Sequence, residues 1–424
     1  MTKKLISFCL IGSLVLIMGV AYAKPPSPAD ALLKLGKSIY NDKNLSINNN
    51  QSCKSCHHNK AGFADMANAN NPSKNVVSVG SITTETGGLN APTAAYAAGS
   101  PQMYWDGELF IGGIFWNGRA TGHKDFNVGC LVPGYGNPIN SPLAEQAQGP
   151  FTNPVEMALP SIAEVVARVA AADYAYLFNL AFNFVDFNNV NLTFDQIAIA
   201  IAFFEESTIL NQFNSNYDTE NLTTEQQAGL ELFENENTAK CALCHVTVGG
   251  PGSAEFTDFS YDNLGIPLNP LIAAKGADPG LGGFIQSVLA QPGAYPPSLV
   301  DVINAGNTAG DAVSANMGKH KVSTLRNIAL TPPYGHNGFF PNLTSIVQFY
   351  NSRDPLACSN MVGGIPVTPA LLDAGIIPGY SGPAGYCWPA PEIAANVNVD
   401  ELGNLGLTPD QVDSIVAFLK ALTD

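Results

Sequence analysis

The pentapeptide Cys-x-x-Cys-His occurs twice in the sequence, at residues 53–57 and 241–245. Two thiols at this spacing can add to both vinyl groups of a haem, and the imidazole of the next residue reaches the iron. A zinc knuckle or a redox dithiol would use similar residues, but zinc needs four converging ligands and the motifs lie in separate halves of the chain. The sequence therefore predicts two covalently bound haem c groups. Their predicted ligands are Cys53, Cys56 and His57, and Cys241, Cys244 and His245.

The first 23 residues have the pattern of an export signal. Lys3 and Lys4 precede an apolar run over residues 5–20, and residues 21–23 form a small-x-small cleavage site. An uncleaved anchor is the alternative, because the run is near the short limit for spanning a membrane. We expect residues 1–23 to be removed as a signal peptide. The mature protein is then periplasmic or otherwise exported, without a membrane span.

The composition narrows the class of protein. Lys and Arg number 19 against 35 Asp and Glu, which gives a net charge of −16. Such an acidic chain is not expected to bind nucleic acid, because phosphate contacts need a basic surface. An acidic surface instead favours a partner with a basic patch. The 40 Gly and 30 Pro predict long loops between the elements.

Several segments carry the sequence signals of helices, which are expected to position the two Cys-x-x-Cys-His motifs. Thr193, Thr223 and Thr408 are each followed three residues later by Gln, as in a capping box, and apolar residues follow at helical spacing. Residues 31–40 and 162–178 are further predicted helices. Strand-like alternation is scarce. The sequence therefore predicts a mainly α fold with long loops.

Two segments resemble each other. Residues 197–208 and 414–423 are both apolar, contain Ala-Phe and end on Ser or Thr. Each follows one of the Cys-x-x-Cys-His motifs, which indicates a tandem duplication with a boundary in residues 211–222. We expect one haem domain over residues 24–215 and a second over 216–424.

Further stretches resemble the bacterial di-haem cytochrome c peroxidase and MauG family over nearly all of the mature length. The similarity implies two tandem cytochrome c-like haem domains, an N-terminal peroxidatic one and a C-terminal electron-transfer one. The matching stretches are residues 62–65 (GFAD), 90–93 (NAPT), 115–120 (FWNGRA), 146–157, 325–327 (LRN) and 331–338 (TPPYGHNG).

The resemblance implies a catalytic role for three residues. It places Glu156 and Gln146 on the distal face of the first haem, with Pro150 nearby. Cleavage of peroxide moves a proton from the near oxygen to the leaving oxygen, which a carboxylate can do. From the sequence alone, a capping or pairing role for Glu156 would be favoured. Trp116 corresponds to the tryptophan between the two haems, where it relays charge, and its alternative role is core packing. Trp105 is the rival position for this tryptophan.

Two departures from the family pattern decide the subclass. Many members carry a histidine that caps the first iron, but no His occurs here between His58 and His123. We therefore expect the first haem to be open to peroxide. The methionine that binds the second iron in cytochrome-oxidising members corresponds to Tyr350. A buried core tyrosine is the alternative, and Met361 and Met317 are the other candidate ligands.

A phenolate favours oxidised iron, whereas a thioether raises the reduction potential. The resemblance therefore implies a MauG-like enzyme that uses hydrogen peroxide to oxidise a protein substrate, with both irons sharing the two oxidising equivalents in a high-valent state. The alternative is a di-haem cytochrome c peroxidase that takes electrons from a small c-type cytochrome. A di-haem electron carrier without catalysis is a third hypothesis.

Several residues outside the haem motifs also carry expectations. Asn90, Thr331 and Pro333 match family positions around a calcium ion, which oxygen ligands suit. Cys358 and Cys387 are the simplest disulfide pair, which would leave Cys130 free. Residues 122–141 resemble an insertion without an evident role. We predict that His123, His320 and His336 are structural or solvent-facing rather than metal ligands.

Overall fold

The computed structural model describes residues 26–126 and 141–424. The predicted signal peptide, Cys130 and most of the 122–141 insertion lie outside the described residues. In the described part, no helix is both long and apolar enough to cross a membrane.

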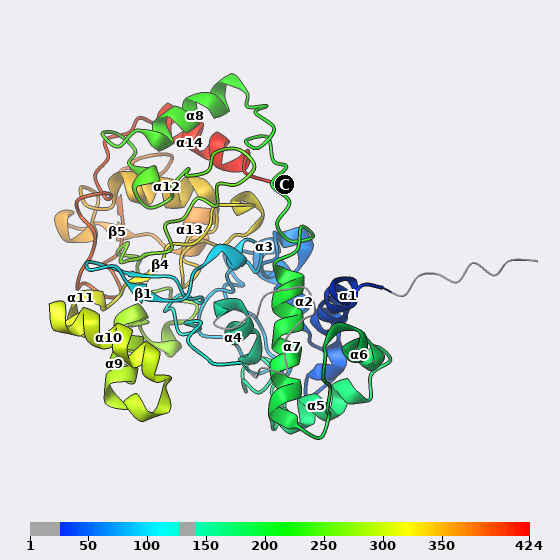
Figure 1. The fold of residues 1–424 in the computed structure, drawn as a ribbon. Coiled ribbons are helices and arrows are strands. Elements are labelled where there is room, and N and C mark those ends of the chain that lie inside the picture. The colour runs from blue at the N-terminus through cyan, green and yellow to red at the C-terminus, as the bar shows by residue number, and fades with distance from the viewer. Residues whose placement is uncertain (1–25, 127–140) are drawn as a thin grey trace, which may run out of the picture.

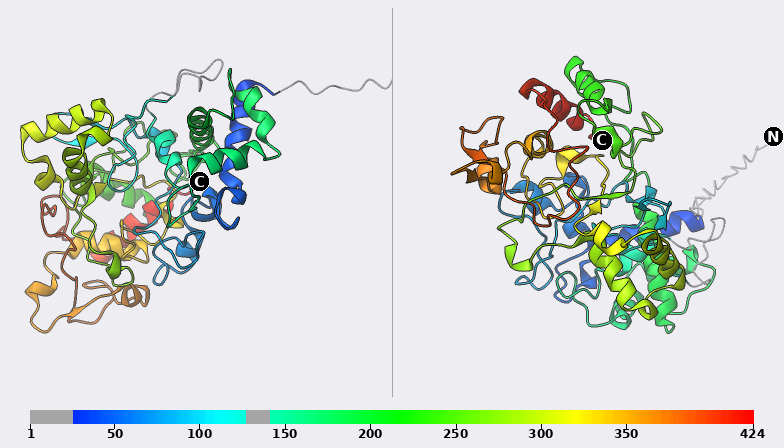
Figure 2. Two further views of the ribbon diagram at one scale, coloured as in Figure 1. Left: turned by 90° about the horizontal axis from the view of Figure 1, so that it is seen from below. Right: turned by 90° about the vertical axis from the view of Figure 1, so that its left-hand side faces the viewer.

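The fold is mainly α with long loops, as the sequence predicts (Figures 1 and 2). The helices of the first half are α1 Pro28–Asn41, α2 Cys53–Cys56, α3 Met66–Asn70, α4 Pro142–Gln148, α5 Ile162–Ala170, α6 Phe178–Ala181 and α7 Val190–Glu205. Those of the second half are α8 Thr224–Glu234, α9 Gly280–Ala290, α10 Pro297–Ala309, α11 Ala312–Asn316, α12 Leu343–Ser352, α13 Pro369–Asp373 and α14 Pro409–Lys420.

The strands of the described part are only two residues long. They form three separate pairs, of which the first two are antiparallel and the third is parallel. The pairs are β1 Tyr104–Trp105 with β2 Phe110–Ile111, β3 Tyr261–Asp262 with β4 His320–Lys321, and β5 Ile365–Pro366 with β6 Tyr386–Cys387.

Two helix pairs repeat one packing arrangement. Helix α1 crosses α7, and α8 crosses α14, with a glycine at each crossing (Figure 1). A Cβ on Gly36 would lie 1.8 Å from the Ala200 carbonyl oxygen, and one on Gly229 would lie 1.9 Å from that of Ser414. Any larger residue would push the helices apart, because backbone atoms cannot give way as side chains do. Both halves therefore use the same close helix contact.

The buried apolar residues form separate cores. One lies within residues 31–210, around α1 and α7, and a second within residues 217–422, around α8, α12 and α14. A third, smaller core joins the β1–β2 pair to α9–α11. The exact domain limits 24–215 and 216–424 stay a prediction.

The local expectations for the helices are partly confirmed. Thr223 and Thr408 are N-caps with the reciprocal Gln contact. The capping box at Thr193 is wrong. Helix α7 begins earlier, at Val190, because the Asn189 side chain caps it, and Thr193 lies inside the helix with its hydroxyl donating to the Asp186 carbonyl.

Two other expectations have clear outcomes. The predicted helix over residues 162–178 ends at Ala170, and a short 3-10 turn and α6 follow. Cys358 and Cys387 form the predicted disulfide, with their Cα atoms 4.9 Å apart. It ties the β5–β6 region to the segment after α12.

Candidate active site

The first Cys-x-x-Cys-His motif forms helix α2 and the residue after it. Ser52 and Ser55 make a reciprocal capping box that holds this single turn. Cys53 and Cys56 are free thiols, and with His57 they line a cavity of about 320 Å³. The turn therefore presents both thiols and the imidazole to one space.

The His57 ring is oriented by a backbone carbonyl. Its Nδ1 lies 3.1 Å from the Phe63 carbonyl oxygen, so Nδ1–H donates there and Nε2 keeps a free lone pair. Phe63 has a positive φ of 61°, in a turn that also contains Gly62. Burial lowers the pKa of His57, which favours the neutral, ligating form. These features fit a proximal haem ligand.

The second motif has the same local arrangement. The 3-10 helix Cys241–Leu243 carries the first cysteine, and Cys241, Cys244 and His245 line a cavity of about 210 Å³. The Nδ1 of His245 lies 2.9 Å from the carbonyl oxygen of Phe256, another positive-φ residue. Burial again lowers the histidine pKa. Both sites therefore have the donors and the space that a covalently attached haem needs.

The first cavity contains the predicted catalytic pair in its lining. Glu156 and Gln146, the latter on α4, line the same cavity as His57, together with Pro150. Asn153 donates to the Glu156 carboxylate at 2.7 Å. Burial raises the pKa of Glu156, and the Arg119 guanidinium and the Asn153 amide oppose that rise. The structure thus brings a proton-accepting group and an amide into the cavity that His57 lines, and their catalytic role stays a prediction.

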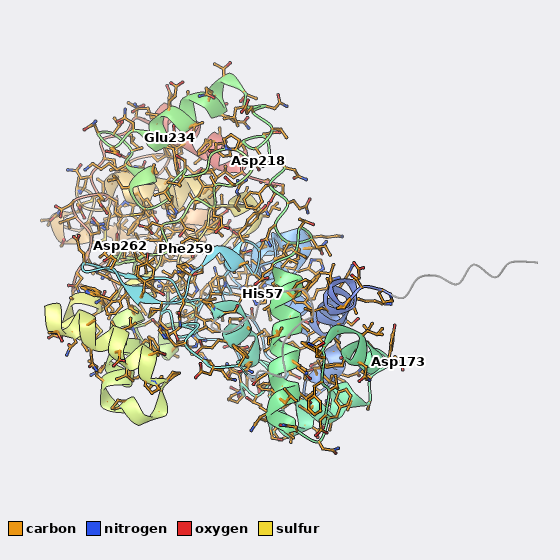
Figure 3. The ribbon with its side chains drawn as sticks, in the orientation of Figure 1. His57, Asp173, Asp218, Glu234, Phe259 and Asp262 are labelled. Carbon is orange, nitrogen blue, oxygen red and sulfur yellow. A yellow bond between two sulfur atoms is a disulfide. The ribbon has the colours of Figure 1, made fainter. Side chains whose placement is uncertain are left out.

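No second histidine lines the first cavity among the described residues. His58, which follows the ligand His57, instead accepts at Nδ1 from the Lys60 backbone N–H. In Figure 3, His57 lies toward α7, whereas Asp262, which lines the second cavity, lies well away from it to the left. The open position at the first haem stays a prediction.

Trp116 lines both cavities. Its indole Nε1–H donates to the Asn90 carbonyl at 2.8 Å, and its ring stands edge-on to His336 with centroids 6.4 Å apart. The rival Trp105 lies in β1 against Phe110 and lines neither cavity. The geometry favours Trp116 over Trp105 as the residue between the two sites, and its relay role stays a prediction.

Tyr350 lies on α12 and lines the second cavity with His245. Its hydroxyl has no hydrogen-bond partner among the described residues, and burial is the main cause that raises its pKa. Neither Met361 nor Met317 lines this cavity, and no other methionine of the described chain does. Tyr350 is therefore better placed than either methionine to serve as the predicted sixth ligand.

The predicted calcium ligands all line the second cavity, and Asn90 also lines the first. The Asn90 side-chain amide contacts the Pro333 carbonyl oxygen. The Thr331 hydroxyl donates to the Ile328 carbonyl at 3.2 Å. The structure thus brings Asn90 and Pro333 together, and calcium binding stays a prediction.

Sequence reasoning missed two titratable residues of the cavities. Glu205 lines the first cavity at the end of α7, and burial raises its pKa to about 8. Lys321 lines the second, and burial lowers its pKa to about 7. A charged residue within an apolar helical run is the signal that could have identified Glu205.

The two motifs and their cavities define a di-haem c-type protein. The family model described as "Di-haem cytochrome c peroxidase" matches residues 30–227. "Methylamine utilization protein MauG" of Paracoccus denitrificans is 33% identical over 432 residues, which covers 98% of this chain and 95% of that protein. "Cytochrome c551 peroxidase" of Nitrosomonas europaea is 28% identical over 82% of this chain and 83% of that protein.

A solved structure is also similar. The diheme peroxidase BthA from Burkholderia thailandensis superposes with a TM-score of 0.67 at 25% identity, covering 94% of this chain and 89% of that one. The chain therefore belongs to the di-haem cytochrome c peroxidase family and is a peroxidase-type oxidoreductase. Membership implies two haem c cofactors.

Proposed function

We propose that this protein is a periplasmic or otherwise exported enzyme that uses hydrogen peroxide to oxidise a protein substrate, as in the MauG branch of its family. The observation that carries the proposal is Tyr350 in a second cavity that no methionine of the described chain lines. A hard phenolate oxygen suits a site that stores oxidising equivalents, whereas a thioether suits one that accepts electrons from a small cytochrome.

The residues around the cavities fit two haem groups. Cys53 and Cys56 would hold the first and Cys241 and Cys244 the second, with His57, His245 and Tyr350 as the iron ligands. When bound, the haems supply the redox chemistry by taking up the two oxidising equivalents of hydrogen peroxide.

Glu156 moves the proton. As a carboxylate it accepts the proton of the bound peroxide and returns it to the departing oxygen. Its raised pKa brings it closer to neutral pH, where such exchange is most effective. The Asn153 amide positions Glu156 through its 2.7 Å hydrogen bond, and the Gln146 amide offers a donor beside the reacting oxygens.

Trp116 passes charge between the two sites. Its Nε1–H donates to a backbone carbonyl, which is too weak a base to take the proton. An oxidised indole at this position therefore keeps its proton and carries positive charge. A calcium ion held by oxygens of Asn90, Thr331 and Pro333 would stiffen the wall on which Trp116 depends.

The similarity to the cytochrome c551 peroxidase of Nitrosomonas favours a second candidate function, reduction of hydrogen peroxide with electrons from a small c-type cytochrome. The two functions differ in the fate of the oxidising equivalents. They can be separated by turnover with a reduced c-type cytochrome, which the second requires and the first does not.

Two experiments test the proposal. Electron paramagnetic resonance of the ferric protein should show one site without a strong sixth ligand and one site with nitrogen and oxygen axial ligands, and Tyr350→Phe should change only the second. Incubation with peroxide and neighbouring exported proteins, followed by mass spectrometry, should reveal oxygen insertion or crosslinks. Fast cytochrome oxidation that Tyr350→Phe leaves unchanged would refute the MauG-like function.

A further inference from the structure

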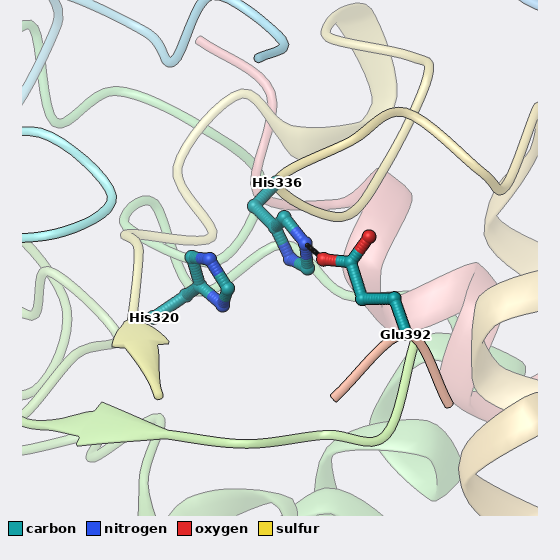
Figure 4. Close-up of side chains that lie close together, drawn as sticks. All are labelled: His320, His336 and Glu392. Carbon is teal, nitrogen blue, oxygen red and sulfur yellow. Dashed lines mark hydrogen bonds and ion pairs between the residues drawn. The ribbon is translucent and has the colours of Figure 1, made fainter. Parts of the chain in front are cut away.

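A cluster of two histidines and two carboxylates lies at the wall of the second cavity. His320 comes from β4, His336 from the loop before α12, and Glu392 from the segment that leads to α14 (Figure 4). One ligand atom from each of these three residues lies within 4.8 Å of the other two. Asp278 completes the cluster, with its Oδ1 3.0 Å from the His320 Nε2.

The cluster is unusual in its charge balance. His320 is 7% exposed, His336 is 4% exposed, and the Glu392 side chain is 5% exposed, whereas Asp278 is partly buried. Buried carboxylates are normally paired with a cation. Among the described residues, the ion pairs of Asp278 and Glu392 are with these two imidazoles, and neither has a lysine or arginine partner. Arg119 interacts electrostatically with Asp278 but forms no ion pair with it, so the cluster, within the described part of the chain, holds two acids without a directly paired permanent cation and can accommodate a positively charged ligand.

We propose that His320, His336 and Glu392 bind a divalent first-row metal ion such as Zn²⁺. Two imidazole nitrogens and one carboxylate oxygen are a common donor set for zinc and for non-haem iron. Calcium prefers an all-oxygen set, so this site is distinct from that of Asn90, Thr331 and Pro333. Both histidines also line the second cavity.

Metal binding requires a defined rearrangement. The two imidazole rings are stacked, with centroids 3.5 Å apart and planes 4° from parallel. A metal lies in the plane of each imidazole that binds it, so one ring turns out of the stack when the ion enters. Asp278 then accepts from the other nitrogen of His320, as carboxylates behind metal-bound histidines do.

A metal ion bound at this site would change how easily Trp116 is oxidised. The His336 and Trp116 ring centroids are 6.4 Å apart, so a dication held by His336 lies close to the indole. Positive charge makes removal of an electron from Trp116 more costly. Bound metal is therefore expected to slow charge transfer between the two sites. This consequence, unlike the site itself, rests on the proposed function.

Zinc content of the holoprotein tests the site. The protein with both haems is treated with 1,10-phenanthroline in calcium-containing buffer, desalted, incubated with ZnCl₂ and analysed by mass spectrometry for zinc. We expect one zinc per chain, held at least tenfold more weakly in His320→Phe and Glu392→Gln. His123→Gln is the control, because His123 is equally buried but bonds Ser298 and the Met103 carbonyl instead.

The outcomes separate this inference from the proposed function. Absence of zinc from the wild-type holoprotein, or zinc retained equally by His320→Phe and Glu392→Gln, overturns the metal site whatever the enzyme oxidises. Haem spectra and thermal melts show whether each variant is folded. If zinc binds and slows peroxide-dependent protein oxidation in wild type but not in His320→Phe, both the site and its action on Trp116 are supported.

Discussion

The two cavities share a frame around their histidines but differ in their other lining residues. In each, a cysteine pair precedes a histidine whose Nδ1 donates to the carbonyl of a positive-φ phenylalanine, Phe63 or Phe256. The cavity that His57 lines also has the polar side chains of Glu156 and Gln146 in its wall. The cavity that His245 lines has Tyr350 in its wall. The comparison teaches that the cysteine pair and the histidine are suited to hold a haem in both cavities. The residues that differ between the cavities are then expected to set the reactivity of each haem.

The largest effect is expected when the carboxylate of Glu156, which distinguishes the first cavity from the second, is removed. Glu156→Gln keeps the shape of the side chain but removes its ability to take a proton. We expect the rate of the first site with peroxide to fall by about 10²–10⁴-fold, measured by stopped-flow absorbance. Glu85→Gln, an exposed change, is the control. An unchanged rate in Glu156→Gln would mean that the proton moves through another group.

Replacing Tyr350 should make the second site resemble that of a cytochrome-oxidising peroxidase. Tyr350→Met offers a thioether, which should raise the reduction potential of the second haem by on the order of 100 mV, as axial ligands tune potential widely. Redox titration followed by absorbance measures it. Tyr350→Phe is the matched variant without a ligand atom. Equal potentials in wild type and both variants would show that Tyr350 is a core residue.

Replacing the glycine at each helix crossing should destabilise the two halves of the protein equally. Gly36→Ala and Gly229→Ala each place a methyl group against a backbone carbonyl. We expect each to lower the free energy of unfolding by about 1–3 kcal/mol, which thermal melts can measure. Gly293→Ala is the control, because a methyl group there would meet no other atom within 4 Å. A large effect in only one half would argue against equivalent packing.

The smallest effect concerns pH. Burial raises the pKa of Glu156 above its usual 4.5, and Arg119 opposes this. A base loses activity when it is protonated, so the rate with peroxide should fall as the pH drops through that raised pKa. Arg119→Gln removes the opposing positive charge, so the midpoint should move to higher pH. A pH profile of the peroxide reaction measures it, and a midpoint shifted to lower pH would contradict the assignment.

Much of the molecule can be predicted from local patterns. The haem motifs, the mainly α class, the N-caps at Thr223 and Thr408 and the disulfide partners are encoded by neighbouring residues or by few alternatives. The pattern at Thr193 predicts the wrong helix start because Asn189, four residues earlier, offers an equally good cap. Competing caps differ by only a fraction of a kcal/mol, so the sequence pattern cannot rank them.

The sequence by itself determined the chemistry that is available: two haem attachment motifs, a carboxylate and an amide in the first half, and a tyrosine in the second. Covalent spacing along the chain is sufficient for that. Only the tertiary structure decided which side chains share a cavity, that Trp116 lines both, and that His320 and His336 stack beside Glu392. These contacts join segments far apart in the chain, so they depend on packing that no local pattern specifies.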